Sequence, residues 1–118
     1  MDPITLETYR QRLLYQQQQI VTRIFEIEED LQKPLSERQI EYMDKAQEEV
    51  PEEVLTRLDE QGRREVEDIQ AALARLEAGT YGRCERCGEA ISVVRLDALP
   101  MARRCLHCQE QIEKGARE

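Results

Sequence analysis

All four cysteines of this 118-residue chain stand in two Cys-x-x-Cys pairs, with seventeen residues between the pairs. They are Cys84, Cys87, Cys105 and Cys108. The tight turn of each pair can bring two sulfurs to one ion, so four thiolates at this spacing predict one structural Zn²⁺ in a tetrahedral site. An iron ion in the same tetrathiolate geometry also fits the spacing. His107, inside the second pair, is expected to be an exposed bystander because four sulfurs already complete the site.

An even number of cysteines in a small chain can also form a disulfide framework. The N-terminus has no basic start followed by an apolar run, which would mark a secretory signal. We therefore expect a cytoplasmic protein, in a compartment where disulfides are rare. A thioredoxin-like dithiol would leave the second cysteine pair unexplained. Both alternatives are weaker than a metal site.

Composition limits what the rest of the chain can build. Only 40% of the residues are hydrophobic and 36% are charged, which is too little apolar material for a large globular core. An elongated helical shape needs less, because each helix buries only a narrow stripe. No stretch approaches the ~20 apolar residues that span a bilayer, so no membrane partner is expected. The net charge of −8 argues against nucleic acid as the main partner, since neutralising phosphates requires an excess of Lys and Arg.

Two stretches carry apolar residues at alternating steps of three and four, the period of an amphipathic helix. The first predicts a helix over about residues 4–33, capped by Asp2 and ended by Pro34. The second predicts one helix from Pro51 to Gly79, in which Gly62 marks a close helix contact. The first seam is Leu6, Tyr9, Leu13, Gln17, Ile20, Ile24, Ile27 and Leu31, and the second is Leu55, Leu58, Gly62, Val66, Ile69, Leu73 and Leu76. Two helices of nearly matched length should fold back as an antiparallel coiled-coil hairpin.

The segment between the predicted helices, about residues 35–50, would form the tip of the hairpin. Eight acids lie between positions 41 and 60, against only Lys45 and Arg57. They are Glu41, Asp44, Glu48, Glu49, Glu52, Glu53, Asp59 and Glu60. Such a run is usually solvated surface. At the end of a rigid rod, it could instead be carried into a positively charged or metal-containing site on a partner.

The region around the cysteines carries a more specific pattern. Tyr81-Gly82 precedes the first pair, Gly88 follows it, and the stretch Arg95-Leu96-Asp97-Ala98-Leu99-Pro100 precedes the second pair. This region resembles the DksA/TraR zinc-finger family, the DnaK-suppressor type of transcription regulators. The resemblance is dense over residues 79–108. Elsewhere it rests on organisation, with a long helical hairpin before the cysteines and a short helix after them.

The resemblance implies a bacterial regulator, not an enzyme, that binds RNA polymerase and inserts the hairpin tip into the secondary channel to modulate initiation, without binding promoter DNA. The family's tip motif, Asp-x-x-Asp-x-Ala, aligns so that Glu41, Asp44 and Ala46 form the functional tip. Glu41 departs from the family's first Asp by one methylene. The family's basic positions that contact guanosine tetraphosphate fall on Asp68 and Leu99. Neither holds a phosphate by charge, so we expect little dependence on this alarmone.

The predicted architecture is all-α: a long antiparallel coiled-coil hairpin over residues 1–78, then a small four-cysteine zinc finger with a terminal helix over residues 79–118. A monomer is expected. Two other functions stay open. A transcript-cleavage factor of the secondary channel would use paired acids to hold Mg²⁺. A zinc-ribbon nucleic-acid binder would use the arginines around the finger, Arg83, Arg86, Arg95, Arg103 and Arg104.

Overall fold

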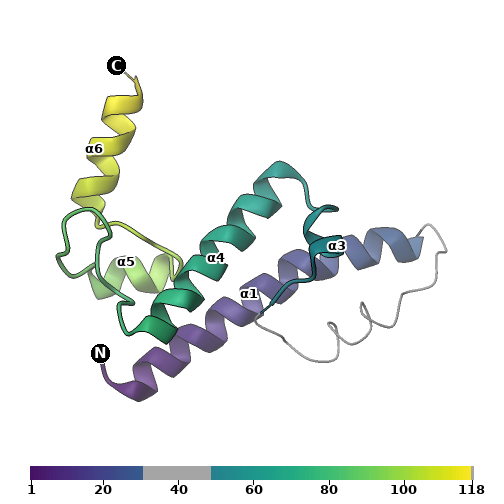
Figure 1. Ribbon diagram of the computed structural model, residues 1–118, viewed down its shortest axis with the longest axis horizontal. Helices are drawn as coiled ribbons and strands as arrows, with labels where there is room; N and C mark the ends of the chain where they lie inside the picture. Colours follow the sequence, from purple (N-terminus) through teal and green to yellow (C-terminus); the bar gives the residue numbers. More distant parts are fainter. Residues whose placement is uncertain (31–48, 118) are drawn as a thin grey trace.

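The computed structural model describes residues 1–30 and 49–117, with side chains for residues 1–23 and 49–115. Within these residues the regular elements are helices. The helices are α1 (Pro3–Asp30), α3 (Glu52–Leu55), α4 (Glu60–Ala78), α5 (Val93–Ala98) and α6 (Leu106–Arg117). Between α4 and α5, one isolated antiparallel bridge pairs Arg83 with Ala90. Figure 1 shows α1 and α4 running in opposite directions, with α6 projecting away from them. The predicted all-α hairpin architecture is confirmed.

The first helix begins where the sequence predicts. The Oδ1 atom of Asp2 accepts a hydrogen bond from the Thr5 N–H at 2.7 Å, which satisfies one of the helix N–H groups that have no acceptor in their own helix. The same bond lowers the pKa of the Asp2 carboxyl. The end expected near residue 33 lies outside the described residues.

The core lies between α1 and α4, along the two predicted seams. The buried seam residues include Tyr9, Leu13 and Ile20 on α1. On α4 they include Val66, Ile69 and Leu73. Burying a side chain of this size contributes roughly 1.5–3 kcal/mol, so these two stripes supply most of the stabilisation of the hairpin. Gln17 is also fully buried in the stripe, where its Oε1 accepts a hydrogen bond from Gln70 Nε2 at 2.5 Å.

The second predicted helix is interrupted, so its prediction as one continuous helix was wrong. The chain leaves helical geometry after α3, and α4 begins again at Glu60. Asp59 is the physical reason, because its Oδ1 accepts a hydrogen bond from the Gly62 N–H at 2.7 Å in an N-cap. The expected match in length also fails: the 28 residues of α1 span about 42 Å and the 19 of α4 about 28 Å.

Two glycines of the second predicted helix behave as predicted. A Cβ atom on Gly62 would lie 3.1 Å from Asp59 Oδ1 and 3.7 Å from Ile20 Cγ2, so this position is a close helix contact. Gly79 ends α4 with a φ of 78°, in the left-handed region that glycine adopts without strain. The next amide, on Thr80, donates to the Arg75 carbonyl at 2.9 Å.

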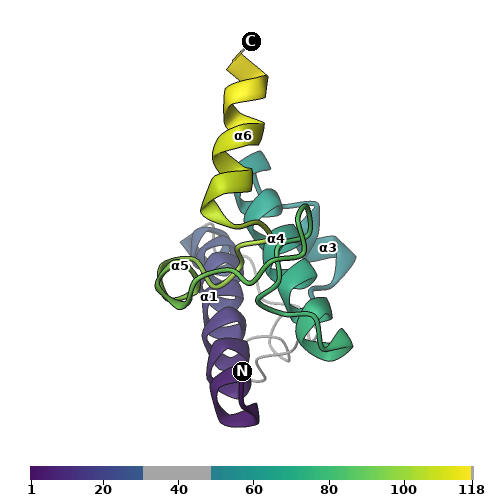
Figure 2. The same ribbon diagram turned by 90° about the vertical axis from the view of Figure 1, so that its left-hand side faces the viewer.

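The finger is tied to both arms at the base of the hairpin. On α1, the Tyr9 hydroxyl donates to Asp97 Oδ1 at 2.6 Å, and Arg12 donates to the Asp97 carbonyl at 2.6 Å. On α4, Asp68 pairs with Arg103 at 3.1 Å. Figure 2 shows α5, seen nearly end-on, at the side of α1. No helix in the described ranges is long and apolar enough to cross a bilayer.

Candidate zinc site

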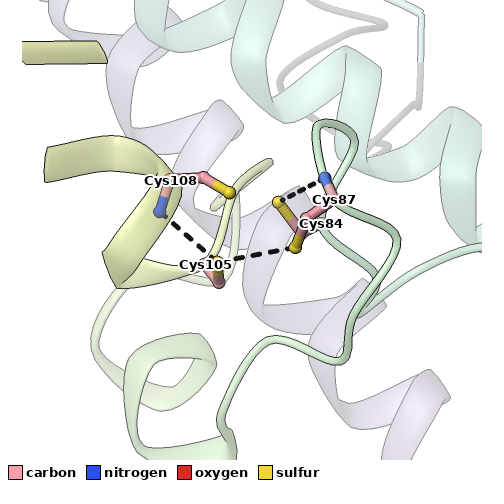
Figure 3. A group of neighbouring side chains, drawn as sticks. All are labelled: Cys84, Cys87, Cys105 and Cys108. Atoms are coloured by element: carbon pink, nitrogen blue, oxygen red, sulfur yellow. Dashed lines mark hydrogen bonds between the residues drawn. The ribbon is translucent and has the colours of Figure 1, made fainter. Parts of the chain in front are cut away.

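The structure brings the four cysteines together. Their sulfur atoms all lie within 4.8 Å of one another, although the two pairs come from separate parts of the finger (Figure 3). The sulfurs of Cys87 and Cys105 are 3.9 Å apart. Sulfurs bound at ~2.3 Å to a tetrahedral Zn²⁺ lie about 3.8 Å from each other, so this spacing fits a single ion.

Each pair forms a turn that points its sulfurs inward. The Cys87 N–H donates to Cys84 Sγ at 3.5 Å, and the Cys108 N–H donates to Cys105 Sγ at 3.5 Å. Gly88 completes the first turn with a φ of 77°, and its N–H donates to the Cys84 carbonyl at 2.9 Å. These bonds direct partial positive charge at sulfur, which favours the thiolate form that binds metal.

The thiols of the site have opposite electrostatic environments. Burial opposes ionisation of Cys84, but backbone N–H groups, first that of Cys87, lower the pKa of its thiol to about 6. Burial and the neighbouring sulfurs raise the pKa of Cys108 to about 12. Four thiols this close cannot all ionise unless a cation offsets their repulsion. A bound divalent metal supplies that charge.

The donor set is complete without any other residue. His107 is exposed and stands apart from the four-cysteine group, as predicted. Four protein sulfurs fill a tetrahedral ion and leave no open position for substrate, which is the arrangement of a structural site. The finger therefore has one structural zinc as its cofactor, and the metal holds the finger in shape.

Most of the arginines around the finger bond within it. Arg86 donates to the Cys108 carbonyl at 3.3 Å and Arg95 to the Arg104 carbonyl at 3.0 Å. Arg104 also contacts Glu85 at 3.1 Å. These bonds join the two cysteine pairs to each other. The arginines thus act as supports of the site, an arrangement that does not favour the nucleic-acid binder.

Sequence reasoning missed the bonds that fix the finger to α1. Asp97 was read only as part of a motif, yet it accepts bonds from Tyr9 and Arg12. A signal was available, because a tyrosine in an apolar seam needs a partner for its hydroxyl. Which residue would supply that partner could not be read, since Tyr9 and Asp97 are 88 positions apart.

The structure describes the two positions aligned with the alarmone contacts but not the residues of the predicted tip. Glu41, Asp44 and Ala46 lie outside the described residues. Asp68 and Leu99 line one cavity of about 490 Å³ together with three arginines. One of these arginines, Arg103, forms an ion pair with Asp68. The carboxylate of Asp68 therefore neutralises one of the positive charges that line this cavity.

Comparison with known proteins covers both parts of the chain. Residues 9–76 match the family model described as DnaK suppressor protein-like, N-terminal domain, and residues 79–114 match the prokaryotic dksA/traR C4-type zinc finger. The chain is 33% identical over 117 residues to the RNA polymerase-binding transcription factor DksA of Caulobacter vibrioides, which covers 99% of this chain and 82% of that protein. It is 37% identical over 116 residues to an uncharacterized protein of Aquifex aeolicus, covering 97% and 80%.

The fold has a solved counterpart. The structure of transcription factor DksA2 from Pseudomonas aeruginosa is similar with a TM-score of 0.68 and 31% sequence identity. The match covers 100% of this chain and 90% of that one. The hairpin and the finger are thus similar to one known protein together, and not only as separate pieces.

Proposed function

This chain belongs to the DksA/TraR family, and we propose that it binds RNA polymerase and regulates transcription initiation without catalysing a reaction. The observation that carries the proposal is the match over nearly the whole chain, hairpin and finger together, to a relative named as an RNA polymerase-binding transcription factor. We further propose that it acts as a monomer in the cytoplasm, with residues 1–78 as the hairpin unit and residues 79–118 as the finger unit.

The working end of the molecule in this proposal is the tip of the hairpin, inserted into the secondary channel of the polymerase. Support comes from the shape of α1, which runs about 42 Å from the finger base toward the tip segment. The described chain next to that segment is acidic, with exposed Glu49, Glu52 and Glu53. Asp44, assisted by Glu41 and Ala46, would present its carboxylate at the catalytic centre of the polymerase.

The zinc site in this proposal sets the base of the rod. The metal fixes the finger, and the finger holds both arms through Tyr9 with Asp97 and through Asp68 with Arg103. Loss of the ion would therefore release the arms from each other at their base. The effect on transcription would be indirect, because the proposal assigns the action on polymerase to Asp44 and not to the finger.

Little dependence on guanosine tetraphosphate is part of the proposal. Support comes from Asp68, whose carboxylate repels phosphate and already pairs with Arg103. Leu99 at the second position is 46% exposed and carries no charge. A phosphate would meet a negative group and an apolar one at these two positions.

The test is abortive or run-off initiation with purified polymerase, comparing the wild type with Asp44→Asn. We expect the wild type to change initiation, with or without added alarmone, and Asp44→Asn to lose the effect. Glu49→Gln, a charge change at a neighbouring exposed acid, is the control that should keep it. Equal activity of Asp44→Asn would refute the tip assignment, and large potentiation by the alarmone would refute the independence. Shortened transcripts from stalled elongation complexes would indicate the cleavage function instead.

A further inference from the structure

The second arm of the hairpin, residues 52–78, is called the returning arm. Its apolar seam continues through the break between α3 and α4. Leu55, Leu58, Gly62 and Val66 keep the steps of three and four, although α3 ends at Leu55 and α4 begins at Glu60. A single helix over residues 52–78 would be about 40 Å long, close to the 42 Å of α1, whereas α4 alone spans about 28 Å. The pattern thus matches a straight arm, and the structure contains a bent one.

A few exposed contacts hold the bend. The cap bond from the Gly62 N–H to Asp59 is one of them. The Leu55 carbonyl accepts from the Leu58 N–H at 3.3 Å and from the Arg63 guanidinium at 3.4 Å. In a continuous helix, the same carbonyl would accept from the amide of Asp59 instead. The bent and straight forms therefore exchange bonds at the same carbonyl.

The segment between α3 and α4 has the bonding pattern of a hinge. The backbone N–H of Arg57 donates to the Val54 carbonyl, three residues back, at 3.0 Å. The backbone N–H of Leu58 likewise donates to the Leu55 carbonyl, three residues back. Such tightened turns within a helical stretch often mark hinges. The hinge comprises residues 56–59.

An open cavity of about 370 Å³ lies beside the hinge. It is lined by Ile20 and Arg23 of α1, by the hinge and by the start of α4, and most of its side chains are polar. Leu58 is buried, but Leu55 is only partly buried. The sequence of α1 continues its seam at Ile24 and Ile27, so a straight arm has further apolar positions to pair with along α1.

Local features support each of the two forms. Asp59 stabilises the bent form because it caps α4. Gly62 already lies in the first turn of α4, so its low helix propensity weakens both forms. The continuous apolar seam favours the straight form. We propose that the returning arm is a two-state hinge, bent at residues 56–59 in the free protein and straight when the acidic tip engages the polymerase. The bound half of this proposal rests on the proposed function.

The first experiment follows the free, zinc-loaded protein by NMR, using the Cα and carbonyl chemical shifts of residues 56–59, which average over the two forms. Asp59→Ala removes the cap and should raise the straight-to-bent ratio about fivefold. Asp59→Asn keeps a capping oxygen and should match the wild type. The hinge is refuted if Asp59→Ala leaves these shifts unchanged or only frays the first turn of α4.

A second variant moves the same equilibrium without touching the cap residue. Residue 62 is helical in both forms, but the Cβ of Gly62→Ala would crowd Asp59 Oδ1 at 3.1 Å in the bent form. We therefore expect the straight-to-bent ratio to rise, with chemical shifts that move in the same direction as in Asp59→Ala. A bent-only arm would instead lose stability with no helical shift at residues 56–59, which would overturn the proposal.

The third experiment adds core polymerase to the wild-type protein and measures amide hydrogen exchange over residues 55–62. In the bent form, the amides of residues 59–61 start a helix and have no acceptor within it. In the straight form, they bond to the carbonyls of residues 55–57 and should exchange more slowly. A bound protein with unprotected amides overturns the bound half. Absence of binding overturns the proposed function, while the chemical shifts of the free variants still decide whether the hinge exists.

Discussion

Gln17 is the one fully buried polar side chain among the described residues, and its replacement tests how the hairpin is held in register. Its Oε1 accepts from Gln70 Nε2 at 2.5 Å across the α1–α4 core. Gln17→Ala removes that bond, worth about 1 kcal/mol, and the buried Cγ methylene, worth about 0.8 kcal/mol, and it leaves a cavity where the carboxamide was. We expect the free energy of unfolding to fall by about 2–3 kcal/mol.

The assay is urea unfolding of the zinc-saturated protein followed by circular dichroism. Gln17→Leu refills the space with apolar atoms while the half-buried Gln70 amide can turn to water, so its cost should be below about 1 kcal/mol. Gln19→Ala, at an exposed position of the same helix, should change stability by less than about 0.5 kcal/mol. If Gln17→Ala were as neutral as Gln19→Ala, the central role of the polar pair in the α1–α4 interface would be refuted.

Three further perturbations test the finger, its attachment and the helix cap. Cys84→Ser should lower bound zinc from about one equivalent per chain and speed amide exchange over residues 79–108 more than in the α4 seam; unchanged exchange would contradict a metal-held finger. Tyr9→Phe removes the bond to Asp97 and should cost about 1 kcal/mol in urea unfolding, whereas the exposed Tyr15→Phe should cost nothing measurable. The pKa of Asp2 is lowered in the folded protein, so the stabilisation from its cap is fully present above the unfolded pKa of 3.8 and is lost as the pH falls through the folded pKa. An NMR titration of the Asp2 carboxyl should therefore have its midpoint below 3.8. A midpoint at or above this value would contradict the cap.

Much of the fold could be predicted from the sequence because its signals are local and periodic. The cysteine spacing specifies how many sulfurs can reach one ion, and the steps of three and four specify which side of each helix is buried. Asp2 and Gly79 mark helix ends through the chemistry of single residues. In each of these cases the physical cause lies within a few positions of the residue concerned.

The break at residues 56–59 could not be read from the seam, because the apolar steps run through these positions without interruption. The available signal was Asp59 three residues before Gly62, a capping residue followed by a weak helix former. The bonds that attach the finger were inaccessible for a different reason. Tyr9 and Asp97 are 88 positions apart, and no local pattern specifies such a distant contact.

The most direct test of the central claim is co-purification of the wild-type protein and Asp44→Asn with core RNA polymerase. The proposal assigns the effect on initiation to the carboxylate of Asp44, and removing that charge leaves the rest of the hairpin and the finger intact. Both proteins should therefore be retained by polymerase to the same extent, at about one copy per enzyme, while the variant fails to alter initiation. Failure of the wild type to bind polymerase would contradict the account.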